Sequence, residues 1–326
     1  MPALLLSACD QAAAIERYAG PTMGAGFEVK WVASPDVERQ VVEREVQSFL
    51  RIANDVFSTW APDSVISRFN AHASTEPFAA PAEHRAMFAS VLRSALEVAA
   101  LTDGAFDPTI QPVVELLGFG RDEGRAPTDA ELASALAKVG WRQLEVLDDG
   151  RVRKLAPAVQ ITLSGLVPGW AADQLGALLA RLGVANSMVD VGGEIACRGS
   201  KPGGRPWIIG IERPAPPGEP SRVHTEVALV GGLATSGSYR NFHLVGDEVV
   251  HHLLDPKTGH NVRHGWASVS VRADDAGLAD ALATAFMVRP GGAEAVVARL
   301  ASRGVRALFL APPDANGVVR ELRVGW

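Results

Sequence analysis

The sequence predicts an α+β fold in which a largely antiparallel sheet packs against helices within a single compact domain. Strand-like segments dominate the second half of the chain, and helical segments occur throughout without strict alternation of strand and helix. No segment is long and polar enough to be a linker between domains, and no repeat recurs at a fixed period. With 326 residues, 47% of them hydrophobic, the chain can bury a sizeable core.

The individual elements follow from hydrophobic periodicity and from residues that begin or end helices. Residues 26–32 alternate as a strand. Ser34 and Pro35 predict the start of the first helix, and Thr128 with Glu131 forms a capping-box pattern at another. Predicted helices cover residues 34–53, 81–101, 128–140, 168–183, 276–288 and 292–303. Predicted strands in the second half cover residues 187–191, 207–211, 227–230, 267–272, 306–310 and 318–324.

The composition bears on the partners that the protein can have. The net charge is −6, the pI is near 5.8 and no basic run is present, so we expect no nucleic-acid partner. No stretch of about 18 apolar residues occurs, so we expect no segment that spans a membrane by itself. Cys9 and Cys197 are too few for a disulfide framework or a cysteine-based zinc site.

The amino terminus resembles the lipobox of bacterial lipoproteins, in which a cysteine is acylated after cleavage. Residues 6–9 read Leu-Ser-Ala-Cys and follow an apolar run. The basic segment and longer apolar segment that normally precede a lipobox are missing, and a chance cysteine is the alternative. We expect residues 1–20 to be a signal remnant and tether and residues 21–326 to be the folded domain. Lipid on Cys9 would then be the only membrane attachment, on the periplasmic side.

Asp280 and Thr284 form a candidate metal-binding pair. They stand four residues apart on the helix predicted at 276–288, so a carboxylate and a hydroxyl share one helix face. Oxygen ligands suit a hard cation such as Mg²⁺, which often shares its shell with substrate phosphates. His252 and Asp255 add a proton acceptor and a second acid, and the set indicates chemistry on a phosphate or pyrophosphate. The alternative for the pair is a solvated helix edge or a bond from side chain to backbone.

Seven segments of the chain require a joint explanation. They are Thr22-Met23-Gly24, Phe57 to Asn70, Thr102 to Thr109, Val189 to Ile195, Ala234 to Tyr239, His252 to Gly259 and Ala279 to Thr284. Their identity, order and spacing resemble the ApbE-type flavin transferases, the FAD:protein FMN transferase family. The resemblance covers roughly residues 20 to 290, and the ordered set is much more specific than any single tripeptide.

This resemblance implies a T-fold-like arrangement and a metal-dependent transferase that acts on the pyrophosphate of FAD. A Ser or Thr hydroxyl of a target redox protein attacks the phosphorus on the FMN side, FMN becomes esterified to the target, and AMP leaves. FAD is then the substrate and Mg²⁺ the cofactor. The implied partner is the acceptor subunit of a membrane or periplasmic redox complex, and residues 21–326 form the flavin transferase domain.

The resemblance also implies roles for individual residues. Asp280 and Thr284 match the metal ligands of the family, and the backbone carbonyl near Gly165 matches a third. His252 matches the base, since imidazole titrates near neutral pH, and Asp255 is the second catalytic candidate. Contacts to FAD are expected from Met23, Trp60, Ala105, Phe106, Asp107, Thr162, Gly192, Gly193, Thr235, Ser236 and Leu254.

Several of these residues have alternative, purely structural interpretations. Met23 can be a core residue, Asp107 before a proline can begin a turn, and Gly192 with Gly193 can mark a bulge. His252 can be an ordinary histidine at a strand end. Because successive strand residues point to opposite faces, at most one of His251 and His252 faces the site.

The chain departs from the family pattern at three positions. Trp60 replaces a Tyr, and a larger aromatic ring can still stack on a ligand ring. In the motif at residues 162–169, Thr162 replaces an Asp and Pro168 replaces a Lys, both of which contact FAD in the family. Proline removes a cation and supplies no donor. Two alternatives to an active transferase therefore stay open, namely a non-catalytic FAD-binding or flavin-chaperone protein and an FAD pyrophosphatase.

Overall fold

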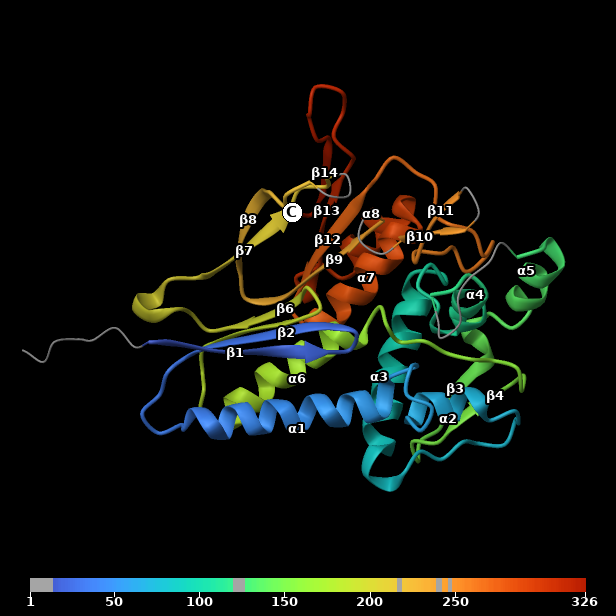
Figure 1. The fold of residues 1–326 in the computed structure, drawn as a ribbon, viewed down its shortest axis with the longest axis horizontal. Helices are drawn as coiled ribbons and strands as arrows, with labels where there is room; N and C mark the ends of the chain where they lie inside the picture. Colours follow the sequence, from blue (N-terminus) through green and yellow to red (C-terminus); the bar gives the residue numbers. More distant parts are fainter. Residues whose placement is uncertain (1–13, 120–126, 216–218, 239–241, 246–247) are drawn as a thin grey trace, which may run out of the picture.

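An eight-stranded sheet forms the centre of the computed structural model, which describes residues 14–119, 127–215, 219–238, 242–245 and 248–326. The strand order is β1-β2-β5-β6-β9-β12-β13-β14, and each of these pairings is antiparallel (Figure 1). The predicted α+β class with a largely antiparallel sheet is confirmed. The strands are β1 (Ile15–Thr22), β2 (Ala25–Val32), β5 (Ser187–Val191), β6 (Glu194–Arg198), β9 (Gly231–Gly237), β12 (Ser268–Ala273), β13 (Arg306–Leu310) and β14 (Glu321–Val324).

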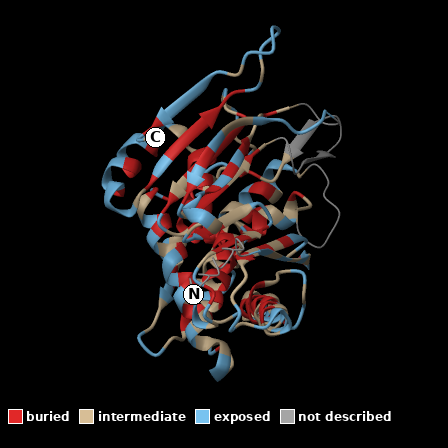
Figure 2. Cartoon of the chain, turned by 90° about the vertical axis from the view of Figure 1, so that its left-hand side faces the viewer, coloured by how far each residue is buried: buried red, intermediate tan, exposed pale blue. Residues whose placement is uncertain are grey.

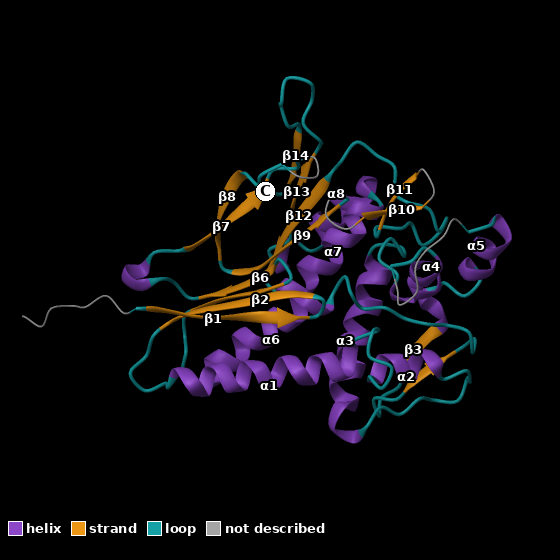
Figure 3. Cartoon of the chain, viewed as in Figure 1, coloured by secondary structure: helices purple, strands orange, loops and turns teal. Residues whose placement is uncertain are grey.

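Shorter strand pairs and the helices complete the described fold (Figure 3). The pairs are β3 (Leu144–Val146) with β4 (Val152–Lys154), β7 (Trp207–Glu212) with β8 (Val223–Leu229), and β10 (Phe242–Val245) with β11 (Glu248–His251). The α-helices are α1 (Arg39–Phe57), α2 (Val65–Ala71), α3 (Ala82–Leu101), α4 (Gln111–Leu116), α5 (Asp129–Leu136), α6 (Val167–Arg181), α7 (Ala276–Val288) and α8 (Ala293–Arg299). Within the described ranges, no helix combines the length and apolar character needed to cross a membrane.

The two faces of the main sheet are covered differently. Alternate residues of a strand point to opposite faces, and Val189 and Met188 of β5 accordingly belong to different clusters. Val189 packs with buried side chains of α1 and α6, whereas Met188 packs under the β7–β8 hairpin with Trp207. Figure 2 shows buried residues along both the strands and the helices beside them. The sheet therefore lies between a helical layer and a smaller β-hairpin layer.

Helix α7 is buried along almost its whole length, with Thr284 as its half-buried exception. It packs against β9, β12 and α6. A Cβ atom on Gly169 of α6 would lie only 2.3 Å from the backbone oxygen of Ala276 and 2.9 Å from Cβ of Asp280. Glycine at this position thus permits α6 and α7 to approach each other closely. The approach places the side chain of Asp280 beside the start of α6.

Several predicted helix boundaries differ from those in the structure: α1 ends at Phe57 rather than at residue 53, α6 at Arg181 rather than at residue 183, and α8 at Arg299 rather than at residue 303. The first helix begins at Arg39 rather than at Ser34, because Val37 donates its backbone N–H to the Ser34 oxygen in a separate turn. The capping box at Thr128 is confirmed, with reciprocal bonds to Glu131. This helix ends at Leu136 rather than near residue 140.

The amino-terminal tether predicted over residues 10–20 overlaps with a strand. Residues 15–22 form β1, the edge strand that pairs with β2 along its whole length. In β1 only Thr22 is buried, so the sequence carries no apolar alternation that would have indicated the strand. Cys9 and the lipobox-like segment lie outside the described residues, and lipid attachment stays a prediction.

Candidate active site

A cavity of about 850 Å³ lies where many separate segments of the chain meet. Its size falls within the range of about 300 to 1,000 Å³ that is typical of ligand sites. Asp255 apart, all predicted site residues line it. These are Met23, Trp60, Ala105, Phe106, Asp107, Thr162, Gly165, Gly192, Gly193, Thr235, Ser236, His252, Leu254, Asp280 and Thr284. A smaller cavity of about 360 Å³ between α4 and α5 contains none of them.

The three candidate metal ligands converge at one wall of this cavity. Asp280 and Thr284 project from α7 one turn apart, as predicted. A Cβ atom on Gly165 would lie 2.8 Å from Thr284 Oγ1, so the backbone at Gly165 closely approaches that hydroxyl. Ser236 Oγ of β9 lies 3.4 Å from the same Thr284 Oγ1. Residues that are far apart in the sequence thus place several oxygen atoms together.

Asp280 is a buried carboxylate with little to balance its charge. Its exposed fraction is 5%, and it accepts one hydrogen bond of 3.2 Å, from Gly169 N to Asp280 Oδ2. Burial raises the pKa of Asp280 well above its usual range, and the negative charges of Glu194 and Asp173 raise it further. Within the described residues Asp280 forms no ion pair. A bound cation would offset these effects directly.

The donor chemistry fits a hard cation. The carboxylate of Asp280, the hydroxyl of Thr284 and the carbonyl of Gly165 are oxygen ligands of the kind that Mg²⁺ prefers. Among the described residues, no group of three His, Cys, Asp or Glu side chains is arranged to hold a metal. A cation at this wall would therefore use hydroxyl, backbone or substrate oxygens besides Asp280.

Asp107 organises the loop that carries Ala105 and Phe106. Its carboxylate accepts hydrogen bonds from Thr109 N (2.8 Å), Thr109 Oγ1 (2.6 Å) and Trp141 N (3.0 Å). Burial raises the pKa of Asp107, although these hydrogen bonds act in the opposite direction. The turn interpretation of Asp107 thus agrees with the structure, and the residue also lines the cavity.

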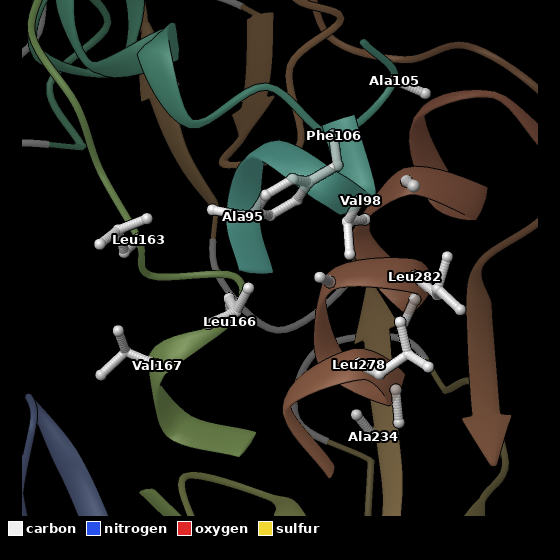
Figure 4. Packing of buried hydrophobic residues seen from close by; sticks show 14 of the residues in the cluster. Ala95, Val98, Ala105, Phe106, Leu163, Leu166, Val167, Ala234, Leu278 and Leu282 are labelled. Atoms are coloured by element: carbon white, nitrogen blue, oxygen red, sulfur yellow. The ribbon is translucent and has the colours of Figure 1, made fainter. Parts of the chain in front are cut away.

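Phe106 connects the cavity to the hydrophobic core. Figure 4 shows its ring among buried side chains of α3, of the segment before α6 and of α7, including Ala95, Leu166 and Leu278. Its Cε2 atom would lie 3.5 Å from a Cβ on Gly165. The loop of residues 105–107, which lines the predicted flavin site, is therefore held in place by the packing of Phe106 in the core.

Gly192 and Gly193 form the two-residue turn of the β5–β6 hairpin, and not a bulge. Both have positive φ angles, +72° and +107°, and the flanking residues Val191 and Glu194 pair directly. Asp190 Oδ1 accepts a hydrogen bond of 2.8 Å from Gly193 N. A Cβ atom on Gly192 would lie 3.1 Å from Glu194 Oε2. The turn therefore brings the Glu194 carboxylate to the cavity.

His252, the predicted base, lines the cavity, whereas His251 does not. This difference agrees with the expectation that at most one of the two faces the site. The His252 ring contacts Phe119 edge to face, with ring centroids 6.4 Å apart. Burial, and then the neighbouring His252, lower the pKa of His251.

Asp255 has a different position from the other predicted site residues. It is not among the residues that line the cavity, and its Oδ1 accepts a hydrogen bond of 2.9 Å from Lys257 N. Its backbone oxygen accepts a hydrogen bond of 2.7 Å from Gly259 N. The residue thus shapes the turn that follows His252, and its predicted catalytic role stays a prediction.

The two departures from the family motif lie at the cavity wall. Thr162 Oγ1 donates to Ser164 Oγ (3.1 Å) and accepts from Ser164 N (3.3 Å), which closes a local turn. Pro168 stands in the first turn of α6. The next residue, Gly169, directs its N–H to Asp280. This donor at the positive end of α6 is therefore already used within the protein.

The remaining predicted contacts have varied surroundings, and the structure adds further lining residues, of which Glu194 and Phe119 adjoin predicted ones. Trp60 is 62% exposed at the cavity, and Thr235 Oγ1 lies 2.8 Å from Ser270 Oγ. Glu194 and Phe119 also line the cavity, although the sequence did not single them out as site residues. Glu194 follows the Gly-Gly turn directly, and that adjacency was the available signal. Phe119 had none, because its contact with His252 depends on tertiary packing.

The fold is similar to that of flavin transferases of known structure. The flavin transferase ApbE from Vibrio cholerae superposes with a TM-score of 0.82 at 32% identity, covering 96% of this chain and 97% of that one. The apo form of Pseudomonas stutzeri flavinyl transferase ApbE gives a TM-score of 0.82 at 33% identity, covering 96% of this chain and 95% of that one.

Sequence comparisons lead to the same group of proteins. FAD:protein FMN transferase from Vibrio cholerae is 35% identical over 291 residues, which cover 87% of this chain and 84% of the relative. The Salmonella typhimurium protein of the same name is 35% identical over 299 residues, which cover 88% and 84%. The ApbE family profile matches residues 23–309. The chain belongs to the ApbE family.

Proposed function

We propose that this chain is an FAD:protein FMN transferase, which moves FMN from FAD to a Ser or Thr of a target redox protein and releases AMP. The observation that carries the proposal is the convergence of Gly165, Asp280, Thr284 and His252 on one cavity. The curated relatives that cover most of the chain bear this activity in their names. Their similarity over the whole cavity-forming region supports the same reaction here.

The reaction assigns a distinct task to each group. His252 accepts the proton of the acceptor hydroxyl, whose oxygen then bonds to the phosphorus on the FMN side. The bond between this phosphorus and the oxygen of the AMP phosphate breaks, and AMP leaves with the electron pair. Phe119 holds the His252 ring from its edge. Asp280, Thr284 and the Gly165 carbonyl would hold Mg²⁺, which supplies charge neutralisation to the diphosphate when bound.

The direct test uses the purified chain with FAD, Mg²⁺ and a target domain bearing a Ser/Thr-Gly-Ala-Thr type acceptor. Mass spectrometry should show the acceptor heavier by one esterified FMN, with AMP released in equal amount. Asp280→Ala should abolish the transfer and retain the fold, while Asp149→Ala, an exposed carboxylate far from the cavity, should behave like the wild type. An unmodified acceptor beside well-folded wild-type protein and bound FAD would rule the proposal out.

Thr162 and Pro168 are uncharged residues of the cavity wall, and they favour a non-catalytic FAD-binding or flavin-chaperone protein as the alternative; an FAD pyrophosphatase is a third candidate. In an FAD pyrophosphatase, water replaces the acceptor hydroxyl, and AMP and free FMN appear without any acceptor. In a flavin chaperone, FAD binds and is released intact. Chromatography of the nucleotides after incubation without acceptor separates these outcomes from transfer.

We also propose that the protein works in the periplasm, held to the membrane by lipid on Cys9, and modifies an acceptor subunit of a membrane or periplasmic redox complex. The lipobox-like residues 6–9 support the anchor. Labelling with radioactive palmitate in cells should depend on Cys9, and Cys9→Ala should lose the label and leave the membrane fraction. Equal labelling of both forms would contradict the anchor without affecting the transferase assay.

A further inference from the structure

We propose that FAD and a divalent cation bind this cavity with strong positive coupling, and that Glu194 sets the strength of that coupling. The inference rests on the proposed function, because it takes FAD as the ligand. Beyond that function, it assigns a role to Glu194. The negative charge of its carboxylate repels the FAD diphosphate and weakens FAD binding until a cation is bound.

The lining of the cavity is rich in negative charge. Carboxylates of Asp107, Asp190, Glu194, Glu212 and Asp280 line the cavity. No Lys or Arg side chain from the described parts of the chain joins them there. The diphosphate of FAD is itself an anion, and like charges at close range repel each other most strongly where water is excluded. Without a cation, the cavity wall therefore repels the nucleotide, and FAD binding is weakened.

Glu194 lies in the same cavity lining as Asp280. The backbone N–H of Gly169, the residue after Pro168, donates a hydrogen bond to Asp280. The tight turn at Gly192 holds Glu194 in place, with its Oε2 atom 3.1 Å from the position of a Gly192 Cβ. The carboxylate of Glu194 thus belongs to the lining of the cavity into which Asp280 also projects.

Pro168 lies beside the Gly192–Gly193 turn, near Glu194. Its Cβ would be 4.0 Å from the same Gly192 Cβ position, and it lines the cavity. The side chain at this position carries no charge. Residue 168 is therefore a place where a new positive charge would face both Glu194 and the bound nucleotide.

Coupling between two ligands is reciprocal, and it defines the experiment. If a cation tightens FAD binding by some factor, FAD tightens cation binding by the same factor. The dissociation constant of FAD is measured by equilibrium dialysis of the full chain, once in EDTA and once in saturating Mg²⁺, without acceptor. Mg²⁺ affinity is measured by calorimetry with and without FAD. We expect Mg²⁺ to tighten FAD binding by about 100-fold, a coupling within the range known for linked sites.

Matched variants test the role of Glu194. Glu194→Gln should bind FAD more tightly than the wild type in EDTA and should lower the coupling factor about tenfold. Glu294→Gln removes the same charge from the exposed face of α8 and should leave the coupling unchanged. Pro168→Lys, compared with Pro168→Ala, should also tighten FAD binding in EDTA, and this pair serves if Glu194→Gln does not fold.

The result that overturns the inference is an FAD dissociation constant that is the same in EDTA and in Mg²⁺, or a coupling factor that Glu194→Gln leaves unchanged. These outcomes are separate from those of the proposed function. Cation-coupled FAD binding without FMN transfer contradicts the transferase alone, whereas transfer with cation-independent FAD binding contradicts the coupling alone.

Discussion

The backbone N–H of Gly169 donates a hydrogen bond of 3.2 Å to Oδ2 of Asp280, which joins the first turn of α6 to the middle of α7. The two residues also approach closely, because a Cβ added to Gly169 would lie only 2.9 Å from Asp280 Cβ. The orientation of the candidate metal ligand therefore depends on how two helices cross. A change in the packing of α6 on α7 should therefore also change the position of the Asp280 carboxylate.

Gly169→Ala should destabilise the fold. The added Cβ would lie 2.3 Å from the backbone oxygen of Ala276, and backbone atoms cannot move aside without shifting a helix. We expect the free energy of unfolding to fall by about 2 to 3 kcal/mol, the upper range for overpacking a core. Urea denaturation followed by circular dichroism measures the change. Gly291→Ala, whose Cβ meets no atom within 4 Å, is the control, and equal stability of both variants would contradict the predicted clash.

Gly165→Ala should weaken metal binding more than it weakens the fold. Its Cβ would lie 2.8 Å from Thr284 Oγ1, and this hydroxyl can rotate away. Displacing a ligand oxygen should lower Mg²⁺ affinity by about 10- to 100-fold, as for other changes beside metal ligands. Calorimetric titration of Mg²⁺ gives the affinity, and thermal unfolding without metal reports on the fold. An unchanged Mg²⁺ affinity would remove Thr284 and Gly165 from the metal site.

Asp107→Ala should loosen the loop that carries Ala105 and Phe106. The change leaves the N–H groups of Thr109 and Trp141 without their acceptor, which costs about 1 to 3 kcal/mol when such groups stay buried. We expect a loss of stability and weaker FAD binding by dialysis. Asp107→Asn retains the acceptor oxygen for Thr109 but cannot accept from Trp141 N, so its effect should be smaller than that of Ala. Equal stability of wild type and Asp107→Ala would contradict the role of this carboxylate in holding the loop.

Lys154 should make stability depend on pH in the alkaline range. Its side chain is fully buried, with Nζ 2.9 Å from the His72 oxygen and 4.6 Å from the centre of the Phe69 ring. Burial lowers the pKa of Lys154 from 10.5 to about 8. Between these pH values the unfolded chain binds more protons than the native chain, so stability contributed at this residue rises with pH.

The comparison with Lys154→Met isolates this effect from other titrating groups. The free energy of unfolding of the wild type, minus that of the variant, should be constant below pH 8 and should increase from about pH 8 to 10.5. Denaturant titrations at a series of pH values provide the difference. A difference that falls with rising pH in this window would show that the buried lysine is not destabilised in its charged form.

Much of the fold was predictable because local signals agreed with the tertiary structure. The bounds predicted for α3 and α7 agree with the structure to within one residue, and the pattern at Thr128 predicted a capping box that is present. The strand at residues 15–22 escaped prediction, since it lies at the sheet edge and is largely exposed. The start of α1 was wrong by five residues, from 34 to 39, because Ser34 belongs to a turn rather than to the helix.

The candidate site shows the same division. Asp280 and Thr284 were visible as a pair, because helical spacing alone brings them to one face. Glu194 could have been found from its place directly after the Gly-Gly turn, whereas Phe119 becomes a site residue only through its packing on His252, which no local pattern encodes. The position of Asp255 likewise depends on how the turn after His252 folds.

The burial of α7 determines how the site responds to fluctuations of the protein. Amide hydrogens in such a helix exchange with solvent only when a large cooperative unit opens, whereas exposed loops exchange through small local openings. Asp280 and Thr284 therefore reside in what should be the slowest-exchanging part of the chain, while Trp60 borders the cavity from an exposed loop. The oxygen atoms of Asp280 and Thr284 should therefore keep their positions, whereas the exposed Trp60 side chain is free to adjust when a ligand binds.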